Sequence, residues 1–363
     1  MQPALVLVLS MSAARGAATL GWRASPSQLA PPPRSGHAAA SDTAGTVWLF
    51  GGYYEYTLDL PRHLPIAKER VPTNDLWRYE EIGRYAGGEW ACVQPVSPDD
   101  DLSRPPPRLC SAAAIVGGEL LLFGGWDPRP AGTGGKILAD VWALDLASDA
   151  WERLADMPGG PTSRHVACTL GDGTLLVHTH RCKDSLLRWD PSARTLVEQP
   201  TSGTAPSPRG LHAAAGLGKL RMVVFGGADQ TGAMSNEAFV LDTRTWEWSK
   251  VEGAGIGPSP RAGVSAASVT DGSVALFGGA ERAPGGGLQP RADTWLLEAE
   301  RDNVWRWQLL RDDGEAAAGI PYRRNAASLT TLAPAADGRA RLLLHGGWDP
   351  FVETYDDTHI LEL

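Results

Sequence analysis

The sequence lacks the short patterns by which several common catalytic sites are identified. It contains no glycine-rich loop followed by Lys-Ser or Lys-Thr, no His-Glu-x-x-His and no Gly-x-Ser-x-Gly. These patterns hold nucleotide phosphates, ligate zinc and present a nucleophilic serine, and each needs its residue types at a fixed spacing. The sequence leaves open whether the protein is an enzyme, and we favour a non-catalytic role.

Cysteine and positive charge are also scarce. The 363 residues include four cysteines, Cys92, Cys110, Cys168 and Cys182, and no Cys-x-x-Cys pair. A zinc ribbon and a disulfide-stabilised scaffold are therefore not expected. We expect a reducing, cytoplasmic location instead. Acidic residues outnumber Lys and Arg by 42 to 33, for a net charge of −9. Nucleic-acid binding needs clustered positive charge, so no nucleic-acid partner is expected.

No run of apolar residues is long enough to cross a membrane. The run from Ala4 to Met11 is far shorter than the ~20 residues that span a bilayer, so no membrane span is expected. We interpret residues 1–18 as a separate N-terminal segment, either a targeting peptide or disordered, and residues 19–363 as one folded domain. A targeting peptide would make the mature protein secreted or organellar instead of cytoplasmic.

The sequence does contain one pattern that recurs six times. Each repeat begins with an arginine, continues with an Ala-rich run and a turn, and then has a second apolar run. The six arginines are Arg34, Arg108, Arg164, Arg209, Arg261 and Arg323. The second apolar run ends in a glycine pair in every repeat except the third, which reads Val177-His178-Thr179-His180. The glycine pairs are Gly51-Gly52, Gly124-Gly125, Gly226-Gly227, Gly278-Gly279 and Gly346-Gly347.

The second half of each repeat is marked by acidic and aromatic residues. After a loop of variable length, an acidic residue precedes an aromatic one, as in Asp75-Leu76-Trp77 and Asp140-Val141-Trp142. A last short apolar stretch carries a tryptophan, such as Trp90 or Trp151. Four short strands separated by turns in each repeat are typical of a β-propeller blade.

The glycine pair, the acidic-aromatic start and the distal tryptophan together resemble the kelch-repeat family. The resemblance covers about residues 19 to 363 and implies an all-β, six-bladed kelch (galactose-oxidase-like) β-propeller with four antiparallel strands per blade. The sixth repeat ends at Leu363 after its third strand, while Thr19 to Arg23 carries Trp22 and has the character of the outer strands. We therefore expect this N-terminal strand to complete blade six and remove its open edge.

Two clusters of residues are candidate metal sites. His178, His180 and Cys182 alternate along a predicted strand and could face one ion. His178, however, aligns with Phe123 and with His345 of the sixth repeat, so its position takes a residue of aromatic size.

The second cluster, Glu353, Asp356, Asp357 and His359, resembles the iron ligands of the plant specifier proteins, which are also kelch propellers. Those ligands follow one another at spacings of four, and here the position after Asp357 is the apolar Leu361. We expect no bound metal and no cofactor.

Strand order predicts where binding takes place. In a four-stranded antiparallel blade, the segment before the first strand and the connection between the second and third strands lie on the same face. The six arginines precede first strands, and the longest loops, led by Tyr53 to Thr73, are connections of the second kind. We therefore predict a monomeric scaffold or adaptor that binds a partner protein or acidic peptide through these six arginines. The alternative is a small-molecule or iron-dependent, specifier- or lyase-like enzyme that uses the axial mouth of the propeller.

Overall fold

The computed structural model describes residues 21–57, 68–81, 88–98, 101–130, 134–270, 272–300, 304–314, 319–350 and 352–363. These ranges form strands and loops and contain no helix. Consequently, nothing in the described chain provides a helix of the length and apolarity that a membrane crossing needs. The predicted N-terminal segment 1–18 lies outside the described residues.

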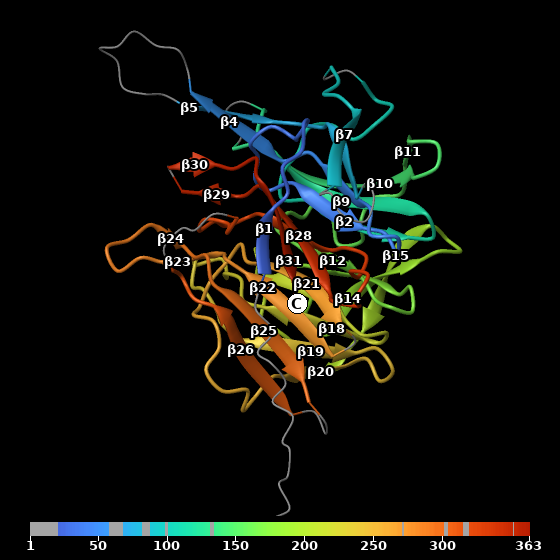
Figure 1. The fold of residues 1–363 in the computed structure, drawn as a ribbon. Coiled ribbons are helices and arrows are strands. Elements are labelled where there is room, and N and C mark those ends of the chain that lie inside the picture. Colours follow the sequence, from blue (N-terminus) through green and yellow to red (C-terminus); the bar gives the residue numbers. More distant parts are fainter. Residues whose placement is uncertain are drawn as a thin grey trace, which may run out of the picture.

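Six antiparallel sheets of four strands succeed one another along the chain, which confirms the predicted six-bladed propeller (Figure 1). Blades one to three contain β2 (Ala38–Ser41), β3 (Val47–Phe50), β6 (Leu76–Glu81) and β7 (Gly88–Gln94); β8 (Ala112–Val116), β9 (Glu119–Asp127), β10 (Lys136–Asp145) and β11 (Ala150–Arg153); and β12 (Val166–Thr169), β13 (Leu175–His178), β14 (Ser185–Asp190) and β15 (Thr195–Pro200).

Blades four to six complete the circle. They contain β17 (Ala213–Leu217), β18 (Arg221–Phe225), β19 (Ala238–Asp242) and β20 (Glu247–Lys250); β21 (Ser265–Thr270), β22 (Ser273–Phe277), β25 (Thr294–Ala299) and β26 (Trp305–Arg311); and β27 (Ser328–Thr331), β28 (Arg341–His345), β31 (Thr358–Glu362) and β1 (Gly21–Ala24). A short strand, β16 (Ser202–Gly203), adds to the outer edge of blade four in parallel with β20.

The core consists of six buried clusters, one at each junction between neighbouring blades. The second strand of a blade is covered on both faces, so β3, β13 and β28 read as nearly continuous apolar runs. First strands lie nearest the axis, where space is smallest, and this explains the Ala-rich sequences of β2, β8 and β17. Large tryptophans fill the wider outer part of the junctions.

The N-terminal strand closes the circle as predicted. β1 pairs antiparallel with β31, with Trp22 opposite Leu361. The Trp22 side chain is 9% exposed, and its ring centroid lies 5.3 Å from that of Phe277 in blade five. Its indole N–H donates a hydrogen bond of 3.3 Å to the Thr294 hydroxyl. Strand pairing to blade six and packing against blade five therefore both depend on this one short strand.

Replacing Trp22 by alanine is expected to lower the free energy of unfolding by ~3–5 kcal/mol, because it leaves a cavity between blades five and six. Chemical denaturation measures the change. Ile256→Ala is the control, since Ile256 is 88% exposed, and it should change the free energy by less than about 0.5 kcal/mol. Equal effects of the two substitutions would contradict closure by β1.

Candidate binding face

A closed ring of backbone hydrogen bonds surrounds the propeller axis where the chain enters the first strands. In each blade one residue with φ between 50° and 66° donates its N–H to the carbonyl of the equivalent residue in the neighbouring blade. The ring residues are Gly36, Cys110, Arg164, Leu211, Gly263 and Ala326, and the six distances run from 2.8 to 3.1 Å. Because the last bond returns to the first residue, the ring fixes the six leading segments around the axis.

Because the ring residues define equivalent positions in the six blades, they show that two of the six predicted repeat arginines are wrongly placed. Arg34, Arg108, Arg209 and Arg261 each lie two residues before a ring residue. In blade three that position is Thr162, whose carbonyl accepts from Gly125 N–H at 2.9 Å, as the Arg108 carbonyl does from Gly52. Arg164 is itself the ring residue there. In blade six the equivalent residue is Arg324. The prediction that Arg323 occupies the repeat position is therefore wrong by one residue.

The arginines at the repeat position are buried, and each is paired with a carboxylate of its own blade. Arg34 is fully buried, and its guanidinium donates to both carboxylate oxygens of Asp75, at 2.9 and 2.7 Å, and to the Gly51 carbonyl at 3.0 Å. Burial alone would raise the pKa of Asp75, but hydrogen bonds from Arg34, Thr73 and Trp77 outweigh it and lower this pKa below its ordinary value. The other pairs are Arg108–Asp140, Arg209–Glu237, Arg261–Asp293 and Arg324–Asp357.

Blade three lacks both members of this pair. Val177 of β13 faces Leu187 of β14, as Leu122 of β9 faces Trp142 of β10. Ser185 therefore takes the place of Asp140, and Thr162 takes the place of Arg108. A buried charge without its partner is strongly destabilising. The absence of the arginine is therefore compatible with a stable blade only because the carboxylate is absent as well.

Of the six arginines predicted to bind a partner, only two present their side chains to solvent. The guanidinium groups of Arg34, Arg108, Arg209 and Arg261 are occupied inside the fold. The Arg164 side chain is exposed above the axis. The Arg323 side chain is 61% exposed and forms a 3.0 Å ion pair with Asp349.

The connections between second and third strands rise on the same side as the ring, which we call the loop face. Isolated bridges join the two sets of segments, for example Ser35 to Tyr53 and Ala262 to Ala280. Hairpins extend three of these connections, namely β4 (Tyr53–Thr57) with β5 (Lys68–Pro72), β23 (Ala280–Arg282) with β24 (Leu288–Pro290), and β29 (Trp348–Asp349) with β30 (Glu353–Thr354) (Figure 1). In blade two, β9 and β10 themselves continue upward, with Lys136 opposite Asp127.

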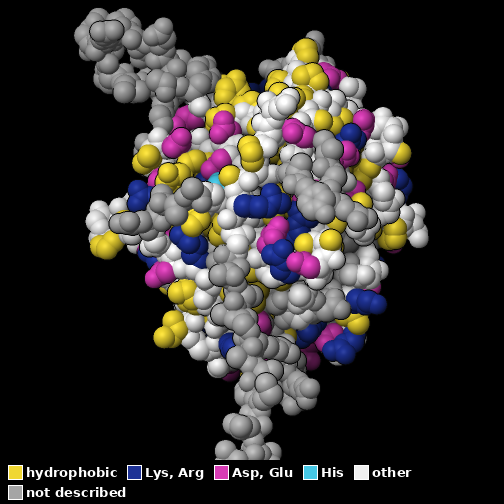
Figure 2. Space-filling view, viewed as in Figure 1, with side chains coloured by type: hydrophobic (Ala, Val, Ile, Leu, Met, Phe, Trp, Pro, Cys, Tyr) yellow, Lys and Arg dark blue, Asp and Glu magenta, His cyan; other side chains and the backbone are white. Residues whose placement is uncertain are grey.

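The wall formed by these connections is uneven. It stands on blades five, six, one and two, whereas blade four has only the short turn around Asp229 and blade three turns directly from β13 to β14. Figure 2 shows basic and acidic side chains interspersed over the visible surface, without a large area of one sign. The visible surface therefore presents no broad area of one charge to a ligand.

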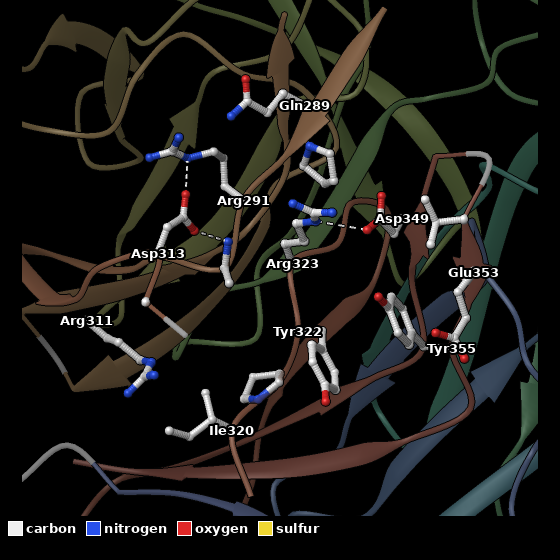
Figure 3. A pocket seen from close by; sticks show the side chains of 15 residues that line it. Gln289, Arg291, Arg311, Asp313, Ile320, Tyr322, Arg323, Asp349, Glu353 and Tyr355 are labelled. Carbon is white, nitrogen blue, oxygen red and sulfur yellow. Dashed lines mark hydrogen bonds and ion pairs between the residues drawn. The ribbon is translucent and has the colours of Figure 1, made fainter. Parts of the chain in front are cut away.

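A cleft of about 540 Å³ opens between the hairpins of blades five and six. Arg291, Arg311, Asp313, Tyr322, Arg323 and Glu353 are among the residues that line it (Figure 3). Arg291 forms ion pairs with Asp313 at 2.5 Å and with Glu281 at 3.1 Å, and Arg323 pairs with Asp349. No repeat pattern marks this cleft in the sequence, because its residues come from two variable loops and from the segment between blades five and six.

The opposite mouth of the axial channel has a different character. It forms a basin of about 960 Å³, lined by turns between first and second strands. Small and hydroxylated residues such as Gly117, Thr169 and Ser268 dominate its lining, and Asp42 is the one charged residue among them. The concentration of charged and aromatic side chains distinguishes the loop-face cleft from this basin.

The two clusters considered as metal sites have other partners in the structure. His178 is buried, and its Nδ1 lies 3.0 Å from Nε2 of His212 in the next blade, while the Cys182 sulfur accepts the Thr179 N–H. Asp357 holds Arg324 and His359. Within the described ranges no group of three or more His, Cys, Asp or Glu is arranged to hold a metal ion.

Buried histidines make the fold sensitive to mild acid. Burial lowers the pKa of His178 to about 3 and that of His165 to about 4, and it also lowers those of His212 and His345. A histidine in the unfolded chain titrates near pH 6.5. Below that pH the unfolded chain therefore binds protons that the folded chain does not, and stability is lost as the pH falls.

We expect the free energy of unfolding to decrease steadily between pH 6.5 and pH 5, by up to ~1.4 kcal/mol per pH unit for each such histidine. Urea unfolding at several pH values measures this slope. His178→Phe and His345→Phe place phenylalanine at the position that Phe50, Phe123, Phe225 and Phe277 occupy in the second strands of the other blades, and each should reduce the slope. Constant stability from pH 7.5 to 5 would contradict the prediction.

Comparisons with known proteins agree with this architecture. The family model described as KLHDC2/KLHL20/DRC7 Kelch-repeats domain matches residues 16–183 and 173–363. An F-box/kelch-repeat protein of Arabidopsis thaliana is 27% identical over 305 residues, which are 75% of this chain and 59% of that protein. The serine/threonine-protein phosphatase BSL2 of the same plant is 29% identical over 226 residues, which are 53% of this chain and 21% of that protein.

A solved structure titled "Structure of YjhT" matches with a TM-score of 0.64 and 17% sequence identity, covering 92% of this chain and 96% of that chain. At this identity the likeness concerns the fold alone. The chain spans about three fifths of the length of the first plant relative and about a fifth of the second.

Proposed function

Because this chain belongs to the kelch-repeat family, a family commonly used as protein-interaction scaffolds, we propose that it binds a partner protein through its loop face. The observation that carries the proposal is the uneven wall of that face, in which the hairpins of blades five and six enclose a charged, aromatic cleft. Variable loops on a rigid scaffold are common places for binding specificity.

The arginines contribute to this function in two ways. The buried ones, such as Arg34 and Arg261, hold the loops in place, because each binds a carboxylate and a carbonyl at the base of its loop. Arg164 and Arg323 have exposed guanidinium groups that can donate paired hydrogen bonds to a partner's carboxylate. An acidic segment of a protein partner therefore remains the favoured ligand.

The test begins with affinity capture of a partner and measurement of its dissociation constant by calorimetry. Arg164→Glu and Arg323→Glu, made singly and together, should weaken binding, the double variant by more than about tenfold, because each places a like charge opposite the partner's carboxylate. Melting temperatures close to that of the parent would show that the fold is intact.

Lys219→Glu with Arg339→Glu is the matched control. It makes the same change in net charge on turns between first and second strands, at the opposite face. This variant should bind the partner within about twofold of the parent, since charges distant from an interface contribute little. A partner that binds the loop-face variant as tightly as the parent, and loses affinity for the control variant, would place recognition on the other face.

A further inference from the structure

We infer that the cleft between blades five and six binds an extended segment of the partner that carries an acidic residue near one end, a basic residue near the other and an apolar residue between them. The inference rests on the proposed function and specifies its ligand. It follows from the charges that the cleft leaves unpaired and from the aromatic surface that separates them.

Most charged groups of the cleft neutralise one another. Arg291 is held by Glu281 and Asp313, and Arg323 is held by Asp349. The side chains of two charged residues that line the cleft, Arg311 and Glu353, make no hydrogen bond or ion pair with any other described residue, although their backbones are paired in β26 and in the β29–β30 hairpin. The charged residues of the cleft that have no ion-pair partner are therefore one cation and one anion, while Arg323 keeps exposed N–H groups beside its pair with Asp349.

These two residues lie on opposite sides of the cleft, with Tyr322 between them (Figure 3). Arg311 ends β26 of blade five, and Glu353 begins β30 of blade six. A ligand with a single charge would satisfy one side and leave the other unmatched. A segment with both charges, spaced to reach both sides, complements the cleft and also fixes the direction in which the segment lies.

The surface between the two charges is aromatic. The Tyr322 ring is parallel to the Tyr355 ring, with an interplanar angle of 4° and 6.5 Å between centroids. Tyr355 is 9% exposed and has the Arg324 guanidinium 4.0 Å from its centroid, whereas Tyr322 is 56% exposed. A supported tyrosine with one open face offers contact to a proline or another apolar side chain.

The cleft also has the size and the stiffness for a short extended segment. Its volume of about 540 Å³ lies within the range of specific ligand sites. Pro290 and Pro321 line it, and proline restricts backbone movement on both walls. The volume and the two fixed proline positions therefore suit a short extended segment.

The experiment uses the full chain and synthetic peptides of twelve residues. Each peptide has a central proline, a pair of aspartates on one side and a pair of lysines on the other, at several spacings and in both orders. A third set replaces the charged residues by asparagine and glutamine. Fluorescence anisotropy with the parent protein should show binding of one charge order about tenfold tighter than the reverse order and the neutral set.

The decisive variant is Arg311→Glu with Glu353→Arg, which exchanges the two charges at constant net charge. It should reverse the preferred order of the peptides. Tyr322→Ala should weaken both orders, and Tyr322→Phe should restore binding because the ring face is retained. The inference is overturned if the parent does not distinguish the three peptide sets, or if the exchanged variant keeps the parent's order.

Failure here can be told apart from failure of the proposed function. A captured partner that loses affinity for the Arg164→Glu variant but binds the charge-exchanged variant normally uses the loop face outside this cleft. That result would overturn the inference and leave the proposed function standing. Normal binding of the partner to all of these loop-face variants would overturn both.

Discussion

A buried guanidinium paired with a carboxylate of its own blade is the interaction on which each of five blades depends. The carboxylate is buried with it in blades one and five and is 38% exposed in blade four. In the blade-five example, Arg261 donates to both oxygens of Asp293 and to the Gly278 carbonyl, so one side chain joins three segments that are distant in sequence. The desolvation cost of two buried charges is offset only when their geometry and remaining hydrogen bonds are satisfied. That requirement explains why the arginine, the glycine pair and the acidic residue occur together in the repeat, and why blade three lacks all of them.

The same pair shapes the surface above it. Because the arginine is anchored at the base of the loop between second and third strands, the loop can change in length and sequence without loss of the blade. Blades five and six use this freedom to raise hairpins around a cleft, while blade three has almost no loop. The proposed binding surface thus varies from blade to blade, while the internal pair beneath it stays the same in five blades. One fold can host many different functions in this way.

Sequence periodicity was sufficient to predict the blades and their closure. The glycine pair reports backbone angles that few residues adopt, and the recurring arginine and tryptophan report buried side-chain positions, so Trp22 could be assigned to blade six before its neighbours were known. The same repeat led to the prediction that all six arginines bind a partner. The spacing of an arginine in the sequence is the same whether its side chain points outward to solvent or inward to a buried carboxylate. Side-chain burial at Arg34 or Arg108 depends on a partner 41 or 32 residues away, which spacing alone does not reveal. Arg311 and Glu353 belong to no repeat position, so periodicity gave no reason to select them.

A double-mutant cycle on Arg261 and Asp293 tests most directly whether the repeated arginine is a structural clamp. Arg261→Thr and Asp293→Ser together reproduce the residues of blade three, and each single substitution leaves one buried charge unpaired. We predict that each single variant loses ~3–5 kcal/mol of unfolding free energy and that the double variant loses clearly less than the sum. Two small and additive losses would contradict this account and return these arginines to the surface role that the sequence first suggested.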